Sequence, residues 1–98
     1  MSERIELDIK VERKGTLYSP DLQIARTRIQ LIDGRAKVRA KRAHAYWLYF
    51  FIEGKAGASA ELIITDPDGN ELLKIEHKTM EIPPLLGKNG GSFRFEVP

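Results

Sequence analysis

The stretch ARTRIQLIDGRAKVRAK, residues 25–41, decides between two fold classes. Apolar and polar residues alternate on both sides of Asp33-Gly34, and an alternation of period two is typical of strands that are buried on one face. Asp-Gly between two such runs is a signal for a two-residue hairpin turn. The stretch therefore predicts a β-hairpin and, with it, an all-β domain.

A helix near residues 20–33 is the alternative that the sequence leaves open. Ser19, Pro20 and Asp21 fit the first positions of a helix, and Gly34 fits the position just beyond its end. Such a helix would make the domain α+β. β-Branched side chains favour strands instead, and this stretch contains Ile24, Thr27, Ile29 and Ile32.

The rest of the chain reads as short strands separated by turns. Asp66-Pro67-Asp68-Gly69 is a hairpin turn, because Pro presets the first turning residue and Gly accepts a positive φ. Residues 83–91, rich in Pro and Gly, are expected to form a loop. Further strands are expected at 3–12, 46–52, 61–65, 72–76 and 92–97.

Turns spaced about ten residues apart are typical of an antiparallel β-sandwich or a small open barrel. We therefore expect one β domain over residues 1–98, an Ig-like or jelly-roll-like sandwich or an open barrel of six to seven strands. Such folds carry many unrelated functions, so the fold class alone predicts none.

Composition excludes several classes of protein. Hydrophobic residues make up 42% of the chain and charged residues 31%, as in globular domains. Cys is absent, which excludes disulfides, thiolate metal sites and Cys nucleophiles. No apolar run approaches the roughly 20 residues of a membrane span, and the N-terminal residues lack a signal-peptide layout. We expect a cytoplasmic protein without a membrane partner, and the scarcity of Asn, Gln and Met favours a thermophilic source.

The predicted hairpin would carry a row of cations on its outer face. With Asp33-Gly34 as the turn, Arg28 lies opposite Arg39 and Arg26 opposite Lys41, and like charges in these positions destabilise a sheet. A polyanionic partner would relieve that repulsion. The cations of this face are Arg26, Arg28, Lys37, Arg39 and Lys41.

Aromatic residues follow the basic segment. If the strand continues without a bulge, Trp47, Tyr49 and Phe51 share the side of the sheet on which the last cations lie. Phosphates pair with Lys and Arg, and bases stack on aromatic rings. We therefore predict a non-enzymatic module that binds single-stranded DNA or RNA through the five cations, with Trp47 and Tyr49 as stacking residues.

Residues 46–52 support a second hypothesis, a homo-oligomeric structural or adaptor module. Both faces of this segment are apolar, whereas a strand of a two-layer sandwich should have one face exposed to solvent. A second subunit, a ligand or the loop at Ile82–Leu86 must cover the other face, and exposed apolar patches usually mark interfaces. The simplest such assembly is a dimer.

The first hypothesis depends on the neighbour of the basic strand. Glu6, Asp8 and Glu12 would neutralise the basic face if residues 3–12 formed the adjacent strand. The oligomer would then be the hypothesis that remains.

The sequence shows no catalytic, metal or cofactor site. His44 and His77 are the only histidines, and neither has a partner at metal-ligand spacing. Residues 66–70, DPDGN, match the start of a calcium loop, but the sixth position is Glu71 rather than Gly. We interpret this segment as a hairpin turn and the histidines as ordinary surface or hydrogen-bonded residues, and we expect no enzyme activity.

Overall fold

The computed structural model describes residues 4–18, 20–55, 57–78 and 86–98. These residues contain no helix, and hence none suited to crossing a membrane. Their strands are β1 (Arg4–Lys14), β2 (Asp21–Ile24), β3 (Thr27–Arg28), β4 (Arg35–Lys41), β5 (His44–Lys55), β6 (Ser59–Thr65), β7 (Glu71–Lys78) and β8 (Leu86–Val97).

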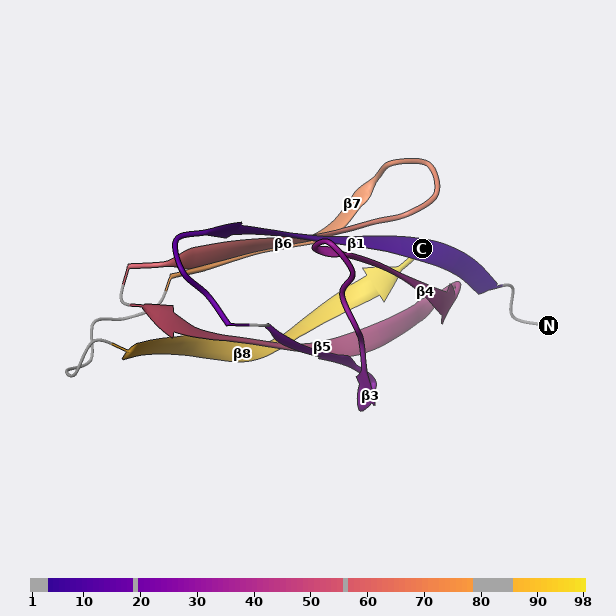
Figure 1. Ribbon diagram of the computed structural model, residues 1–98. Helices are drawn as coiled ribbons and strands as arrows, with labels where there is room; N and C mark the ends of the chain where they lie inside the picture. Colours follow the sequence, from indigo (N-terminus) through magenta and orange to yellow (C-terminus); the bar gives the residue numbers. More distant parts are fainter. Residues whose placement is uncertain (1–3, 19, 56, 79–85) are drawn as a thin grey trace.

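The strands form two antiparallel sheets that pack face to face (Figure 1). Sheet A has the strand order β4-β1-β6-β7, and sheet B has the order β3-β2-β5-β8. The predicted β-sandwich is confirmed. The alternative helix near residues 20–33 is wrong, because that stretch forms β2, β3 and the chain that leads to β4.

Alternating side chains build the core between the sheets. In β1, the even-numbered residues from Arg4 to Glu12 are exposed and the apolar ones between them are buried. Inward side chains of sheet B, which alternate in the same way, pack against them. Each fully buried Leu, Ile or Phe stabilises the fold by about 1.5–3 kcal/mol. The largest fully buried side chains are Leu7, Ile9, Leu22, Leu48, Phe50, Ile52, Leu62, Ile64 and Val97.

The predicted hairpin across Asp33-Gly34 forms only at its tip. Both turn residues have positive φ, 53° and 74°, and Ile32 and Arg35 exchange two backbone hydrogen bonds of 2.9 and 3.0 Å. Beyond this pair the arms separate, since β3 joins β2 in sheet B and β4 joins β1 in sheet A. The prediction of a continuous ribbon over residues 26–41 is wrong, because β1 offers β4 a ladder of seven residue pairs with a matching apolar face.

A second two-residue turn, at Ala25-Arg26, joins β2 to β3. Both residues have positive φ, 49° and 68°, although neither is a residue type that favours this conformation. The turn pairs β3 with β2, whereas the predicted hairpin paired these residues of β3 with residues of β4.

The chain changes sheets between β4 and β5. Ala43 has a φ of 56° at the corner, and the Tyr46 hydroxyl oxygen accepts a 2.8 Å hydrogen bond from the Lys41 backbone N–H. β4 and β5 therefore lie in opposite layers, which separates the basic segment from the aromatic one.

Strand β8 is longer than expected. Residues 86–91, which we expected in a loop, pair with the second half of β5, so the expectation is wrong for them. Glycine weakens a strand without forbidding one, and β5 offers a partner along all twelve residues of β8. Pro83-Pro84 and the rest of the expected loop, up to residue 85, lie outside the described residues.

Gly34 supports a prediction about the turn that leads into β4. Its carbonyl oxygen accepts a 2.7 Å hydrogen bond from Val11 N–H, and a Cβ added at Gly34 would lie 2.6 Å from the Val11 carbonyl oxygen. Gly69 also has positive φ, but an added Cβ there meets nothing within 4 Å. Gly69→Ala should lower the free energy of unfolding by about 1 kcal/mol through backbone strain. Gly34→Ala should lower it clearly more, as measured by urea denaturation, and equal losses would contradict this packing.

Candidate functional site

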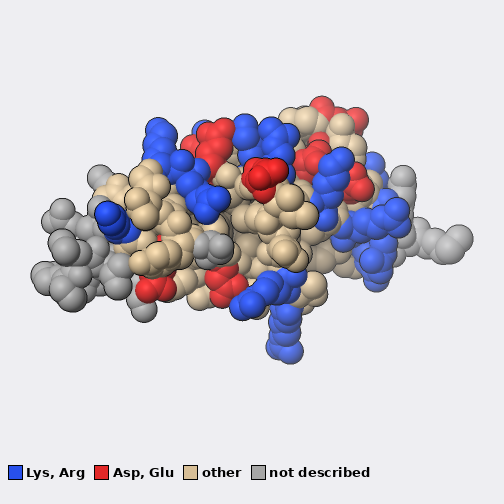
Figure 2. Space-filling view, in the orientation of Figure 1, with Lys and Arg blue, Asp and Glu red and all other residues tan. Residues whose placement is uncertain are grey.

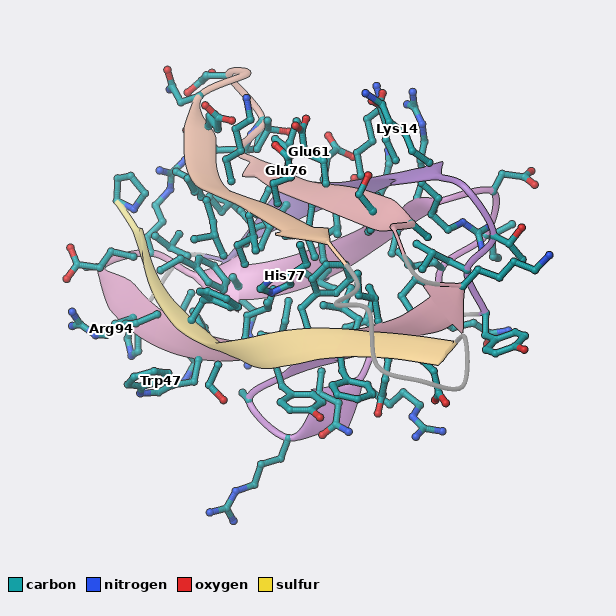
Figure 3. All side chains as sticks on the ribbon, turned by 90° about the vertical axis from the view of Figure 1, so that its left-hand side faces the viewer. Lys14, Trp47, Glu61, Glu76, His77 and Arg94 are labelled. Carbon is teal, nitrogen blue, oxygen red and sulfur yellow. The ribbon has the colours of Figure 1, made fainter. Side chains whose placement is uncertain are left out.

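The predicted cations of β4 and the predicted aromatic residues lie on opposite sides of the sandwich. Lys37 and Arg39 alternate with inward-facing residues of β4 and project outward from sheet A. Trp47 and Tyr49 project outward from sheet B. Figure 3 shows Trp47 on the outer side of sheet B, far from the outer side of sheet A. The predicted common face is wrong, because outward residues of β4 and β5 belong to different layers.

Carboxylates of β1 accompany the cations of β4. Glu6 lies opposite Arg39, and Asp8 lies opposite Lys37. Lys37 Nζ is 3.4 Å from Glu6 Oε1 and 4.0 Å from Asp8 Oδ1. Figure 2 shows acidic and basic side chains interleaved over the upper layer, which is sheet A. Each exposed pair contributes only about 0–1 kcal/mol to stability, but together these carboxylates reduce the positive potential that a polyanion would need.

Glu12 differs from the other two carboxylates of β1. It lies beyond the ladder with β4 and forms a 2.8 Å ion pair with Lys10, whose hydrogen bond lowers the pKa of Glu12. Glu12 lies opposite Glu61 of β6, and Glu61 lies opposite Glu76 of β7. Figure 3 shows Glu61 and Glu76 on the outer side of sheet A. Nowhere in the described ranges do three His, Asp or Glu side chains form a group that could hold a metal ion.

The outer face of sheet B carries a row of aromatic side chains along β5. Trp47 is 61% exposed and Tyr49 is 38% exposed, while Phe51 is half-buried. The rings of Tyr49 and Phe51 are nearly parallel, 7° apart, with centroids separated by 6.3 Å. We call Trp47, Tyr49 and Phe51 the aromatic row. Antiparallel sheets normally leave such a face to polar side chains, so this row is the most unusual feature of the described surface.

Polar side chains flank the aromatic row. Arg94 of β8 lies directly opposite Trp47, and Ser92 lies opposite Tyr49. Gln23 of β2 lies on the other side of Tyr49. A hollow of about 450 Å³ opens beside the row, and its lining includes Gln23, Arg26, Trp47, Tyr49 and Ser92.

Charged residues of both signs surround the aromatic row. Three arginines, Arg26, Arg28 and Arg94, and three carboxylates, Asp21, Glu53 and Glu96, lie beside it. Arg28 Nε is 3.7 Å from Asp21 Oδ1, and Arg94 Nη2 is 3.2 Å from Glu96 Oε1. Lys55, at the end of β5, and position 88 of β8, a lysine opposite Glu53, add two more cations away from Trp47. This face is therefore rich in Arg and aromatic groups and carries charges of both signs.

The structure divides the seven predicted binding residues into two groups. Arg26, Arg28, Trp47 and Tyr49 surround the outer face of sheet B, and Lys37, Arg39 and Lys41 lie on the outer face of sheet A. Sequence reasoning missed Arg94, although the alternation of residues 92–97 predicts that it faces outward. Only the pairing of β8 with β5 places it beside Trp47.

His77 occupies an inward-facing position of β7, so its interpretation as an ordinary residue is wrong. Its ring lies between the sheets (Figure 3), with centroids 5.7 Å from Phe50 and 5.3 Å from Phe93. Nε2 is buried without a hydrogen-bond partner, and burial lowers the pKa of His77. His44, in contrast, is exposed, and its Nδ1 lies within hydrogen-bond distance, 2.9 Å, of the Arg42 carbonyl oxygen.

Asp66 organises the turn between β6 and β7. Its Oδ1 accepts hydrogen bonds from the backbone N–H groups of Asp68 (3.0 Å) and Asn70 (2.8 Å), and its Oδ2 accepts one from Asn70 Nδ2 (3.0 Å). The hydrogen bond from the Asn70 side chain is the main reason that the pKa of Asp66 is lowered. The interpretation of residues 66–70 as a hairpin turn is confirmed, because Gly69 also donates to the Asp66 carbonyl oxygen.

No family model, curated protein or solved structure matches this chain. Its function therefore has to be inferred from its own residues, and the outer face of sheet B is where those residues depart most from an ordinary solvated sheet.

The burial of His77 predicts how stability depends on pH. The pKa of His77 in the folded state lies below its unfolded value of about 6.5. Below pH 6.5 the unfolded chain therefore binds more protons than the folded one, and the free energy of unfolding should fall as the pH falls. Urea denaturation between pH 5 and 8 should show this loss in the native protein.

His77→Phe should remove that part of the pH dependence, because Phe can occupy the same place beside Phe50 and Phe93. His44→Gln, on the surface, is the matched control and should leave the dependence unchanged. A His77→Phe variant that still lost stability between pH 7 and 5 as the native protein does would contradict this role for His77.

Proposed function

We propose that this chain is a non-enzymatic, homo-oligomeric interaction module that packs the outer face of sheet B against the same face of a second copy. The observation that carries the proposal is the exposed aromatic row on a regular strand in the middle of this sheet. On the outer face of β1, in the other sheet, every position from Arg4 to Glu12 is charged.

The residue types around the aromatic row support an interface between proteins. The cores of such interfaces are enriched in Trp, Tyr, Phe and Arg and depleted in Lys. Three arginines, Arg26, Arg28 and Arg94, lie beside the row, whereas the lysines Lys10, Lys37 and Lys41 lie on the outer face of sheet A. The carboxylates that accompany the cations of this face also favour a protein partner over a polyanion.

The distribution of charge along the face favours a second copy as the partner. Arg26 lies at the Trp47 end of β2, where Ala25 N–H donates to the Trp47 carbonyl oxygen, and Asp21 lies opposite Phe51 at the other end. A twofold axis that crosses β5 at Tyr49 would make the two copies of β5 antiparallel. Trp47 would then lie over Phe51 of the second copy, and Arg26 would lie near its Asp21.

Burial of the aromatic row is the energetic basis of this association. Apolar area removed from water contributes about 25 cal/mol per Å², and a Trp or Tyr side chain can bury about 150–250 Å². The rings of Trp47 and Tyr49 in two copies can therefore contribute several kcal/mol, which is the scale needed to offset the entropy lost on association.

Replacement of the two exposed rings tests the proposal. The double variant Trp47→Ser/Tyr49→Ser should at least halve the mass of the assembly in sedimentation velocity, while the thermal midpoint changes little because both rings lie outside the core. Ile32→Ser is the matched control, since Ile32 is 72% exposed but lies at the turn before β4. A double variant with the mass of the native protein would overturn the proposal.

Binding of single-stranded nucleic acid is a second candidate function for the same face. The hollow beside Trp47 and Tyr49, with Arg26 in its lining and Arg94 next to Trp47, favours it. Stacking on an aromatic ring contributes about 1–3 kcal/mol per base. Affinity for single-stranded DNA or RNA that falls with salt and is lost in Trp47→Ala, without a change of assembly, would support this candidate. Absence of binding at low salt would exclude it.

A further inference from the structure

The four edge strands of the sandwich differ in how they are protected against pairing with another chain. β3 has only two residues, β4 carries a Lys or Arg at every second position, and β7 is interrupted by a bulge opposite Ile64 and Thr65. Short edges, charged edges and bulges are the usual means by which proteins prevent edge-to-edge pairing. Three of the four edges therefore have a recognisable protection.

Strand β8 is the exception. It is twelve residues long, pairs regularly with β5 on one side, and has no hydrogen-bonded strand on its other side within the described part of the chain. From Gly91 onward its inward side chains are Phe93, Phe95 and Val97, and its outward charges are Arg94 and Glu96, which have opposite signs. Long unprotected edges are templates for the addition of a further strand.

We infer that β8 pairs antiparallel with β8 of a second copy across a twofold axis at Phe95. In this register Arg94 lies opposite Glu96 of the second copy, and the symmetry provides this contact twice. Phe95 lies opposite Phe95, and Phe93 lies opposite Val97, so that the inner apolar faces of the two sheets continue into each other. Sheet B thereby becomes half of an eight-stranded sheet.

The charges of Arg94 and Glu96 favour this register over the two adjacent registers. Because side chains alternate between the two faces, the axis can move only in whole residues without mixing inward and outward positions. An axis at Arg94 would place the two copies of Arg94 opposite each other, and an axis at Glu96 would do the same for Glu96. Like charges directly opposite destabilise a sheet, and opposite charges stabilise it.

The edge interface is separate from the face described above and does not depend on it. A chain that has both would carry two surfaces that each pair with themselves, and two such surfaces extend the assembly beyond a dimer. The outer face of sheet B stays uncovered when β8 pairs, so both contacts can form together.

Charge reversal in the Trp47→Ser/Tyr49→Ser background tests the edge interface alone. This background variant should be a dimer in sedimentation velocity. Arg94→Glu or Glu96→Arg, added to it, places like charges opposite each other at both contacts. Either change should raise the dimer dissociation constant roughly tenfold or more. Lys74→Glu, an exposed change on β7 in sheet A, is the charge-matched control and should leave the dimer intact.

Mixing the two charge variants is the decisive step. Each contact between a chain with Arg94→Glu and a chain with Glu96→Arg joins opposite charges, so the mixture should form dimers with a dissociation constant well below that of either variant alone. The face interface cannot produce this rescue, because it does not bring residues 94 and 96 together. A monomeric background variant, or a mixture that dimerises no more tightly than either variant alone, would overturn the edge pairing. A background variant with the native mass would instead overturn the face proposal.

Discussion

The antiparallel pairing of β1 with β4 is the interaction on which the distribution of charge and aromatic groups depends. It places Glu6 and Asp8 opposite cations of β4 and packs the small apolar residues of β4 against the core. It also draws β4 into sheet A, so that the corner at Ala43 must carry the chain across to sheet B. The basic and aromatic segments, adjacent in sequence, are thereby placed on opposite surfaces of one molecule.

This separation gives the two outer faces different chemistry. Sheet A presents alternating cations and carboxylates, and the cations of β4 also protect an exposed edge from pairing. Sheet B presents rings beside arginines, next to the long edge strand β8. The proposal that sheet A faces solvent and sheet B faces a partner follows from which strands share a layer rather than from a ligand site.

The sequence predicts local features of the fold well and long-range ones poorly. Alternation identifies which side chains of β1 and of residues 92–97 face inward, and turn chemistry identifies Asp33-Gly34 and Asp66-Pro67-Asp68-Gly69. Alternation does not do so for β5, because both faces of residues 46–52 are apolar. The partner of β4 could not be derived, because both β1 and residues 26–32 carry a matching pattern and only the assembled core distinguishes them. The turn at Ala25-Arg26 carries no turn signal, and the positions of Arg94 and His77 depend on strands far away in sequence.

Trp47 is the only Trp in the chain, so its fluorescence reports directly on the aromatic row. In the isolated chain its ring is 61% exposed, and its emission at the highest dilution should be that of an indole in water. If the outer face of sheet B is an interface between copies, the emission maximum should shift to shorter wavelength as the protein concentration rises, and quenching by acrylamide should fall in parallel. Emission and quenching that stay constant while sedimentation shows a single chain at all concentrations would contradict the account.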